Sequence, residues 1–174
     1  MSTWDHCRRA FAWVDHLAPA VVVNIATVGP VGYWGRAPGT NGTVVGLLYV
    51  AAVYPTLSPP GALLVLLLSL YLAVAFCDAA EQRLGRRDPG CVILDEVVAM
   101  PLCFPGVLGL AYARGWPPWT MALAAFALFR FFDILKPLGI NNLQRLPGGL
   151  GVVADDVAAA LATCLVLNAI VRIG

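Results

Sequence analysis

The sequence predicts an all-α fold: a small polytopic membrane protein with four or five hydrophobic helices. Of its 174 residues, 60% are hydrophobic and only 12% are charged, whereas soluble domains are usually about 45–50% apolar and about 25% charged. The apolar residues form long continuous blocks, and the alternating ten-residue strands of a membrane barrel are missing from the sequence. The length suits one domain, so a single domain is expected over residues 1–174.

Five hydrophobic blocks are separated by turns rich in glycine and proline, at residues 44–57, 61–77, 97–113, 119–135 and 157–173. A transmembrane helix needs about 20 apolar residues. The first block reaches that length only with residues 40–43. The sequence therefore predicts four membrane spans, with five as the alternative. Pro101 and Pro105 should kink or shorten the third block. In the N-terminal segment, residues 1–29, the apolar stretch 18–28 is too short to span and is expected to lie in the interface or to re-enter.

Charge is distributed unevenly across the predicted bilayer. In a five-span arrangement, one side carries Arg8, Arg9, Arg36, Arg83, Arg86, Arg87, Lys136 and Arg145. The other side carries only Arg114 and Arg172, so the basic side should be cytoplasmic. The polar segments 36–43, 88–96, 130–136 and 148–156 reach the same side, which predicts an active site at the cytoplasmic interface. The net charge of only +1 argues against a nucleic-acid partner, and nothing in the sequence indicates an oligomeric state.

The acidic residues in these segments are candidate metal ligands: Asp95, Glu96, Asp133, Asp155 and Asp156. Both acidic pairs are expected where a loop enters an apolar helix. Clustered carboxylates repel unless cations or protons compensate them, and hard oxygen ligands suit Mg²⁺ or Mn²⁺. Arg130, Asp133 and Lys136 share one helix face, which places two phosphate-binding cations beside the acids.

Each motif alone also has a simpler structural explanation, such as an acid that stabilises a helix start or a glycine-rich turn. Ionisable groups at several helix ends on one membrane face nevertheless favour function. The only histidines, His6 and His16, precede every motif, which argues against phosphohistidine or histidine–zinc chemistry. Five cysteines without paired spacing argue against a disulfide framework. Phosphate-loop and nucleophile-elbow motifs are also missing, so metal-assisted phosphate chemistry on carboxylates remains.

Four ordered motifs resemble those of the phosphatidylglycerophosphatase A family. Residues 36–43, RAPGTNGT, resemble its A-P-G-T-x-G-[ST] segment, and residues 88–96, DPGCVILDE, resemble D-P-x-x-[IV]-[IV]-x-D-E. Residues 129–137, FRFFDILKP, resemble F-R-x-x-D-x-x-K-P, and residues 148–156, GGLGVVADD, resemble G-G-x-G-x-x-x-D-D. The chain departs from the family pattern at Leu135, Ala99 and Gln144, where relatives often have Trp, Gly and a nearby acid.

The resemblance implies a Mg²⁺-dependent enzyme of the bacterial cytoplasmic (inner) membrane. Its substrate would be phosphatidylglycerol phosphate in the bilayer, hydrolysed to phosphatidylglycerol and phosphate. Catalytic roles are expected for Asp95, Glu96, Arg130, Asp133, Lys136, Asp155 and Asp156, the five acids among them as Mg²⁺ ligands. Substrate binding is expected for Arg36, Thr40, Asn41, Gly42, Thr43, Asp88, Gly148 and Gly149, with residues 40–43 in a turn that presents hydroxyl and N–H groups.

Several alternatives stay open at this stage. Attack on phosphorus by an aspartate or by an activated water is compatible with this set of residues. Another lipid phosphate such as phosphatidate could be the substrate. A small membrane transporter is also open, although it is expected to carry charge at midplane depth in several helices, and residues 61–77 carry none. A membrane scaffold without catalysis would show no metal dependence.

Overall fold

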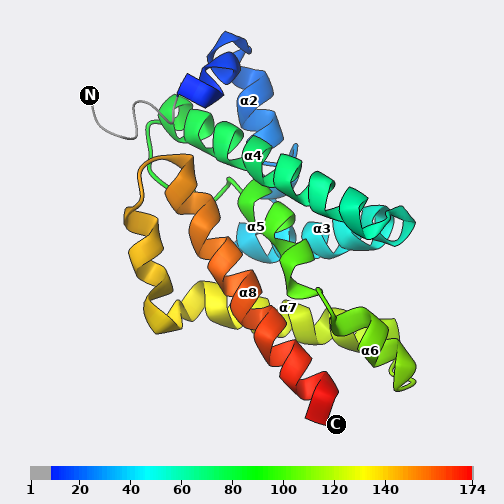
Figure 1. Cartoon of the computed structure of the whole chain (residues 1–174). Coiled ribbons are helices and arrows are strands. Elements are labelled where there is room, and N and C mark those ends of the chain that lie inside the picture. The colour runs from blue at the N-terminus through cyan, green and yellow to red at the C-terminus, as the bar shows by residue number, and fades with distance from the viewer. Residues whose placement is uncertain (1–8, 174) are drawn as a thin grey trace.

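A computed structural model describes residues 9–173, and within that range it contains helices and connecting loops but no strand (Figure 1). The all-α prediction is therefore confirmed. Residues 1–8 lie outside the described range, and they include His6 and Arg8, the latter predicted on the basic side of the bilayer. The elements, in order, are η1 (Arg9–His16), α2 (Pro19–Ala26), η2 (Val31–Tyr33), α3 (Pro38–Val53), η3 (Tyr54–Thr56), α4 (Pro59–Leu84), α5 (Leu94–Ala99), η4 (Met100–Cys103), α6 (Val107–Ala113), α7 (Pro118–Leu135), η5 (Pro137–Arg145) and α8 (Gly149–Ile173).

Three of these helices, α4, α7 and α8, are long and apolar enough to cross a membrane. The number becomes four if α5–η4 and α6, which are bent by 47° at a short break, form one broken span. The break lies between Cys103 and Val107 and contains Pro105, so the predicted kink in the third block is confirmed. Helix α3 has 16 residues, about 24 Å at 1.5 Å per residue, which is shorter than the about 30 Å hydrocarbon core of a bilayer.

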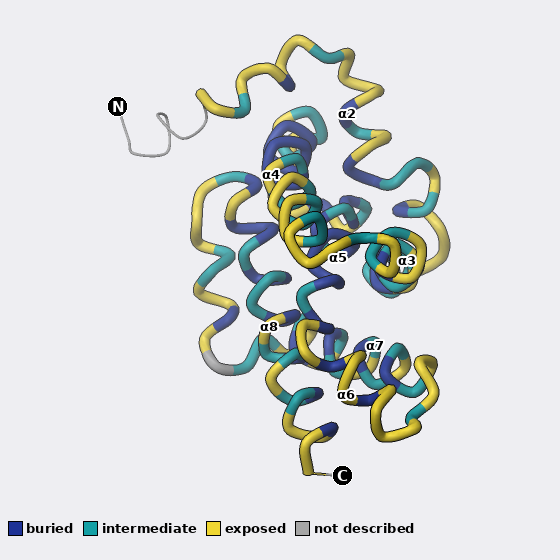
Figure 2. Tube along the Cα trace, turned by 45° about the vertical axis from the view of Figure 1, so that its right-hand side comes forward, coloured by how far each residue is buried: buried dark blue, intermediate teal, exposed yellow. Residues whose placement is uncertain are grey.

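The outward faces of these helices are apolar, as lipid-facing surfaces must be. Leu63, Leu64, Leu67 and Leu68 of α4 are each more than half exposed, and the burial tube shows exposed residues along this helix (Figure 2). Trp119 and Leu123 of α7 and Leu165 of α8 extend this surface. An apolar surface of this extent is unfavourable in water, so it fits the polytopic membrane fold.

Helix α8 lies between two buried clusters that hold the molecule together. One cluster packs its C-terminal half against α7, η4 and α6. The other packs its N-terminal half against α4, which in turn packs against α2 and η1. Ala73 and Ala80 of α4 and Ala159 and Ala160 of α8 are fully buried. Small side chains let helix backbones approach closely in a membrane, so these alanines allow α8 to pack deep inside the fold.

Four helix ends meet around one cavity: the N-terminal ends of α3, α5 and α8 and the C-terminal end of α7. The C-terminal part of α4 lies beside the start of α8, where Asp78 accepts a hydrogen bond from the Gly149 N–H (Figure 1). Proline in the first turn favours the starts of α3 and α7, and Gly85, at φ 63°, ends α4. The predicted convergence of polar segments at one end of the molecule is therefore confirmed.

Two predicted boundaries are wrong. Helix α3 already begins at Pro38, so residues 40–43 are helical and form no turn. Helix α8 begins at Gly149, so Asp155 and Asp156 lie almost two turns inside it and not at its start. In both cases the glycines belong to the helix, and they are required there because a closely packed neighbour leaves no room for a side chain.

Candidate active site

A cavity of about 270 Å³ lies where the ends of α3, α5, α7 and α8 meet, and we call it the acidic cavity. Its wall contains all seven predicted catalytic residues: Asp95, Glu96, Arg130, Asp133, Lys136, Asp155 and Asp156. Asp88, Gly39, Gly90 and Val152 also line it. Residues from four separate sequence motifs therefore line one polar cavity.

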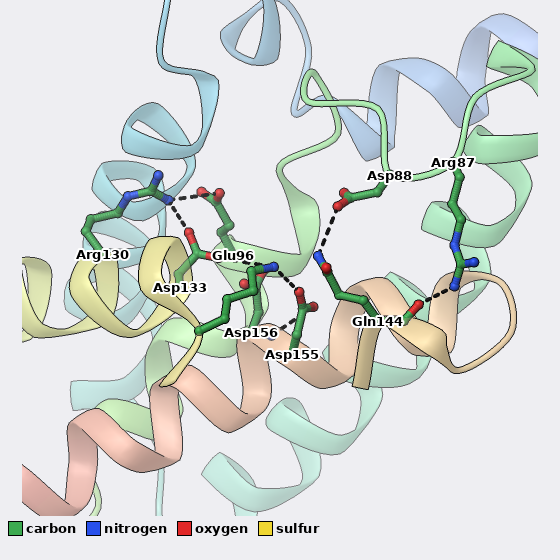
Figure 3. Close-up of polar contacts among 9 residues, drawn as sticks. Arg87, Asp88, Glu96, Arg130, Asp133, Gln144, Asp155 and Asp156 are labelled. Carbon is green, nitrogen blue, oxygen red and sulfur yellow. Dashed lines mark hydrogen bonds and ion pairs between the residues drawn. The ribbon is translucent and has the colours of Figure 1, made fainter. Parts of the chain in front are cut away.

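Arg130 connects the acids of two helices. Its Nη1 donates to Glu96 Oε1 on α5 at 3.1 Å and to Asp133 Oδ2, one turn further along α7, at 2.7 Å (Figure 3). The side chains are only 12–17% exposed, so this ion-pair network is shielded from water. The prediction that Arg130 and Asp133 share a helix face is confirmed.

Lys136 connects α7 to α8. Its ammonium group forms an ion pair with Asp155 and lies 4.0 Å from Asp133 Oδ1. Burial lowers the pKa of Lys136, but its hydrogen bond to Asp155 and the charges of Asp155, Asp133 and Asp156 outweigh burial and raise the pKa above its ordinary value. Lys136 also ends α7 with a left-handed φ of 45°, a conformation uncommon outside glycine that turns the chain at this point.

Two carboxylate oxygens in the acidic cavity are buried and have no hydrogen-bond partner among the described residues, Asp95 Oδ1 and Glu96 Oε2. Six carboxylates line the cavity against two cations, so negative charge is in excess when all are ionised. Such a set attracts a further cation or protons. Within residues 9–173, no three His, Cys, Asp or Glu side chains are arranged as a ready-made metal site.

These donors fit Mg²⁺ because this ion is usually held by one or two carboxylates and completes its shell with water and substrate phosphate. Asp95 and Glu96 offer hard oxygen atoms that no other described group satisfies. Asp133 and Asp155 are engaged by Arg130 and Lys136, which makes them weaker candidates for ligands.

The two glycines at the start of α3 leave room for Glu96. A Cβ atom added to Gly39 would collide with Glu96 Oε1 and come within 2.7 Å of Arg130 Nη1. A Cβ atom on Gly42 would collide with Glu96 Oε2 and touch Ile93. The glycines of the RAPGTNGT segment therefore bring the α3 backbone against the carboxylate at the centre of the cavity.

Other residues predicted to bind substrate are placed differently. Thr43 is fully buried, and its hydroxyl donates to the Gly39 carbonyl at 2.9 Å. Asn41 donates its amide to the carbonyl oxygens of Val31 and Trp34, which fastens the preceding loop to α3. Arg36 and Thr40 do not line the acidic cavity. The expected phosphate-binding turn is thus a packed helical turn.

Gly149, the first residue of α8, has a structural role. Gly149 is buried against α4, where a Cβ atom would strike Val74 O and approach Asp78 N at 2.5 Å. Its backbone N–H donates to Asp78 Oδ1 at 3.2 Å. Asp78 was not among the sequence-based candidates, although an acid that follows a long uncharged helical run is a recognisable signal.

Asp88 stands between the acidic cavity and a second polar cavity. Its backbone is left-handed, with φ 45°, and its carboxylate accepts a hydrogen bond from Gln144 Nε2 at 3.3 Å (Figure 3). Next to it, Arg87 Nη2 donates to the carbonyl oxygens of Gln144 and Leu146. Asp88 and Val152 line both cavities, so the two spaces adjoin.

Comparison with known proteins identifies the family. Residues 24–171 match the model of the family described as phosphatidylglycerophosphatase A. A Haemophilus influenzae protein of that name is 34% identical over 135 residues, covering 77% of this chain and 78% of its own length. The Escherichia coli protein of the same name is 27% identical, covering 76% and 75%.

A Bacteroides thetaiotaomicron protein is 34% identical as well, covering 75% of this chain and 80% of its own length, and carries the provisional name phosphatidylinositol-3-phosphatase. No solved structure matches the chain. The family match extends over most of the sequence and includes all four motifs that meet in the acidic cavity. The chain therefore belongs to the phosphatidylglycerophosphatase A family.

Proposed function

We propose that this chain is a Mg²⁺-dependent lipid phosphatase that hydrolyses phosphatidylglycerol phosphate to phosphatidylglycerol and inorganic phosphate. The observation that carries the proposal is the composition of the acidic cavity. It combines two cations suited to phosphate with two buried carboxylate oxygens that have no partner among the described residues. The family membership supports the substrate class, because relatives carry the corresponding name.

Arg130 and Lys136 are the groups proposed to hold the phosphate. A guanidinium binds phosphate oxygens through paired N–H donors, and an ammonium adds a point charge. Both cations are held by carboxylates, Arg130 by Glu96 and Asp133, Lys136 by Asp155, so their positions are set before substrate binds. Preorganised donors of this kind stabilise charge that develops in the transition state.

Asp95 and Glu96 are proposed to hold Mg²⁺, with Asp156 close by in the same wall. When bound, the ion supplies Lewis-acid chemistry that polarises the phosphoryl oxygen and promotes attack by water. The remaining steps rest on the chain: the cations orient the phosphate and stabilise the negative charge that develops on it. Hydrolysis breaks the bond between phosphorus and the glycerol oxygen, so lipid alcohol and phosphate leave separately.

The acidic cavity is proposed to face the cytoplasm. It lies at the end of the molecule that carries Arg86, Arg87 and Arg145, whereas Arg114 and Arg172 lie at the opposite helix ends, and positively charged loops usually stay inside. The test introduces Arg86→Cys or Arg114→Cys into a variant without the native cysteines and labels it with a membrane-impermeant thiol reagent. Arg86→Cys should react in inverted vesicles, and Arg114→Cys should react in right-side-out vesicles.

The direct test is phosphate release by the purified chain from a panel of lipids, with Mg²⁺ and after chelation. Phosphatidylglycerol phosphate, phosphatidate and phosphatidylinositol 3-phosphate are presented in mixed micelles. We expect release from phosphatidylglycerol phosphate, dependent on Mg²⁺. Preferential phosphate release from another lipid would assign that lipid as the substrate. Activity after thorough chelation would contradict the proposed Mg²⁺ dependence. Lack of activity on every lipid would favour a transporter or scaffold.

A further inference from the structure

We propose that the cavity beside the acidic cavity is a second phosphate-binding subsite, centred on Arg145. We call it the arginine cavity. It measures about 360 Å³ and is lined by Arg87, Asp88, Asn141, Gln144, Arg145 and Gly148, together with Gly151 and Val152. The inference deepens the proposed function, because it rests on phosphate chemistry in the adjoining acidic cavity.

The arrangement of donors in the arginine cavity indicates what it binds. Arg145 and Asn141 form no side-chain hydrogen bond or ion pair with any described residue, so a guanidinium and an amide remain free to donate. Asp88 is the one acidic residue among the lining residues, and one of its carboxylate oxygens already accepts a hydrogen bond from Gln144. A ligand with several acceptor oxygens and negative charge fits this surface, and a phosphate group has both.

Arg87 keeps the wall of the arginine cavity in place. One of its terminal nitrogens donates to the carbonyl oxygen of Gln144 (Figure 3). The same nitrogen donates to the carbonyl oxygen of Leu146, on the other side of Arg145. The η5 segment that carries Asn141 and Arg145 is thereby tied to the loop after α4. The backbone that carries Arg145 is therefore held in place, which reduces the conformational entropy lost when Arg145 binds a ligand.

The position of the arginine cavity suggests two sources for the phosphate. It shares Asp88 and Val152 with the acidic cavity, so a ligand that spans both could place two phosphate groups at once. Phosphatidylglycerol phosphate has a phosphodiester in addition to the monoester that is cleaved. Inorganic phosphate released in the acidic cavity could occupy the same donors on its way to solvent.

The variant Arg145→Gln tests the subsite and Arg86→Gln is the matched control. Arg86 is exposed, lies in the same group of basic residues and does not line the arginine cavity, so both variants lose the same charge near the membrane. KM for phosphatidylglycerol phosphate and the inhibition constant of inorganic phosphate are measured for both. Asn141→Ala is a second variant that leaves the net charge unchanged.

If the lipid phosphodiester binds here, Arg145→Gln raises KM by about 10-fold, which corresponds to ~1.4 kcal/mol, and Arg86→Gln does not. If released phosphate binds here, Arg145→Gln weakens inhibition by inorganic phosphate by a similar factor while KM follows the control. Either result supports the subsite. Arg145→Gln and Asn141→Ala that both match Arg86→Gln in KM and in inhibition would overturn it.

A binding measurement separates this inference from the proposed function. Inorganic phosphate at millimolar concentration should raise the melting temperature of the detergent-solubilised chain, and less so for Arg145→Gln than for Arg86→Gln. If the chain hydrolyses no lipid but shows this difference in melting temperature, the subsite is supported and the proposed activity is wrong. If the chain is active but phosphate raises the melting temperature of both variants equally, the subsite alone is wrong.

Discussion

The carboxylate of Asp78, on α4, accepts a hydrogen bond from the backbone N–H of Gly149, the first residue of α8, at 3.2 Å. Asp78 is only 5% exposed, and its second oxygen accepts from Gln82 at 2.7 Å. The contact caps the free N-terminal end of α8 and fixes the position of this end of α8 against α4. Because Asp155 and Asp156 follow in the next turns of α8, Asp78 acts as a positioning residue for the acidic cavity.

Replacing Asp78 by alanine should destabilise the protein and lower its activity. The change leaves the buried Gly149 N–H without an acceptor, which costs about 1–3 kcal/mol, and it loosens the end of the helix that carries the acids. Asp78→Asn keeps a side-chain oxygen in place and should preserve most of the stability. Thermal unfolding in detergent and phosphate release are measured on both variants, and an alanine variant that melts and turns over like the asparagine variant would contradict this role.

A methyl group at position 42 should disturb Glu96 more than the fold. In Gly42→Ala the added carbon would lie against Glu96 Oε2 and Ile93, and overpacking of this kind usually costs about 1–3 kcal/mol. Since the carboxylate must move to make room, we expect at least a 10-fold loss of kcat/KM on the lipid substrate, a change of ~1.4 kcal/mol.

Gly109→Ala is the matched control for this substitution. Gly109 lies within α6, and a Cβ atom there meets nothing within 4 Å. Alanine is favoured over glycine inside a helix by about 0.8–1.0 kcal/mol, so this variant should be as stable as the unmodified chain or slightly more so, with full activity. Equal losses in the two variants would show that helix flexibility and not the contact with Glu96 explains the effect.

The sequence allows the gathering of the site to be predicted, since proline, glycine and charge mark the ends of each hydrophobic block. It also predicts the Arg130–Asp133 contact, because both residues lie on one helix face and one turn apart. The contacts from Arg130 to Glu96 and from Lys136 to Asp155 join different helices. Such pairings depend on how the helices cross, which is set by the packing of small residues such as Ala80 and Ala159 and leaves no local pattern.

The same limit explains the misplaced boundaries of α3 and α8. Glycine usually marks a turn or a helix end, so the sequence predicts turns around Gly39, Gly42 and Gly149. In the structure Gly39 and Gly42 lie inside α3 and Gly149 is the first residue of α8, and at each of them another chain segment approaches too closely for a side chain. The local sequence reports the glycine, but only the tertiary contact distinguishes a close approach from a turn.

Asp95→Asn and Asp156→Asn should abolish turnover without preventing insertion into the membrane. Each change removes a negative charge from a carboxylate that is at most 6% exposed and keeps nearly the same volume, so packing is preserved. For Asp95→Asn we also expect a higher Mg²⁺ concentration for half-maximal activity, because Asp95 Oδ1 is one of the two proposed ligand atoms. Phosphate release is measured against Mg²⁺ concentration, with Asp15→Asn in η1 as the control. Full activity of both cavity variants would remove the carboxylates from the mechanism.

Arg130→Lys should cost activity even though the positive charge is kept. Arg130 Nη1 donates to both Glu96 and Asp133, and a single ammonium on a flexible stem cannot reproduce the planar fork that is proposed to bind the phosphate as well. Loss of one preorganised donor in a transition state typically costs about 10²–10³-fold in kcat. Arg114→Lys is the control, since Arg114 lies at the opposite end of the molecule and donates to the Arg172 carbonyl at 2.9 Å. If Arg130→Lys retains the kcat of Arg114→Lys, Arg130 contributes charge alone and the geometry of its fork has no part in catalysis.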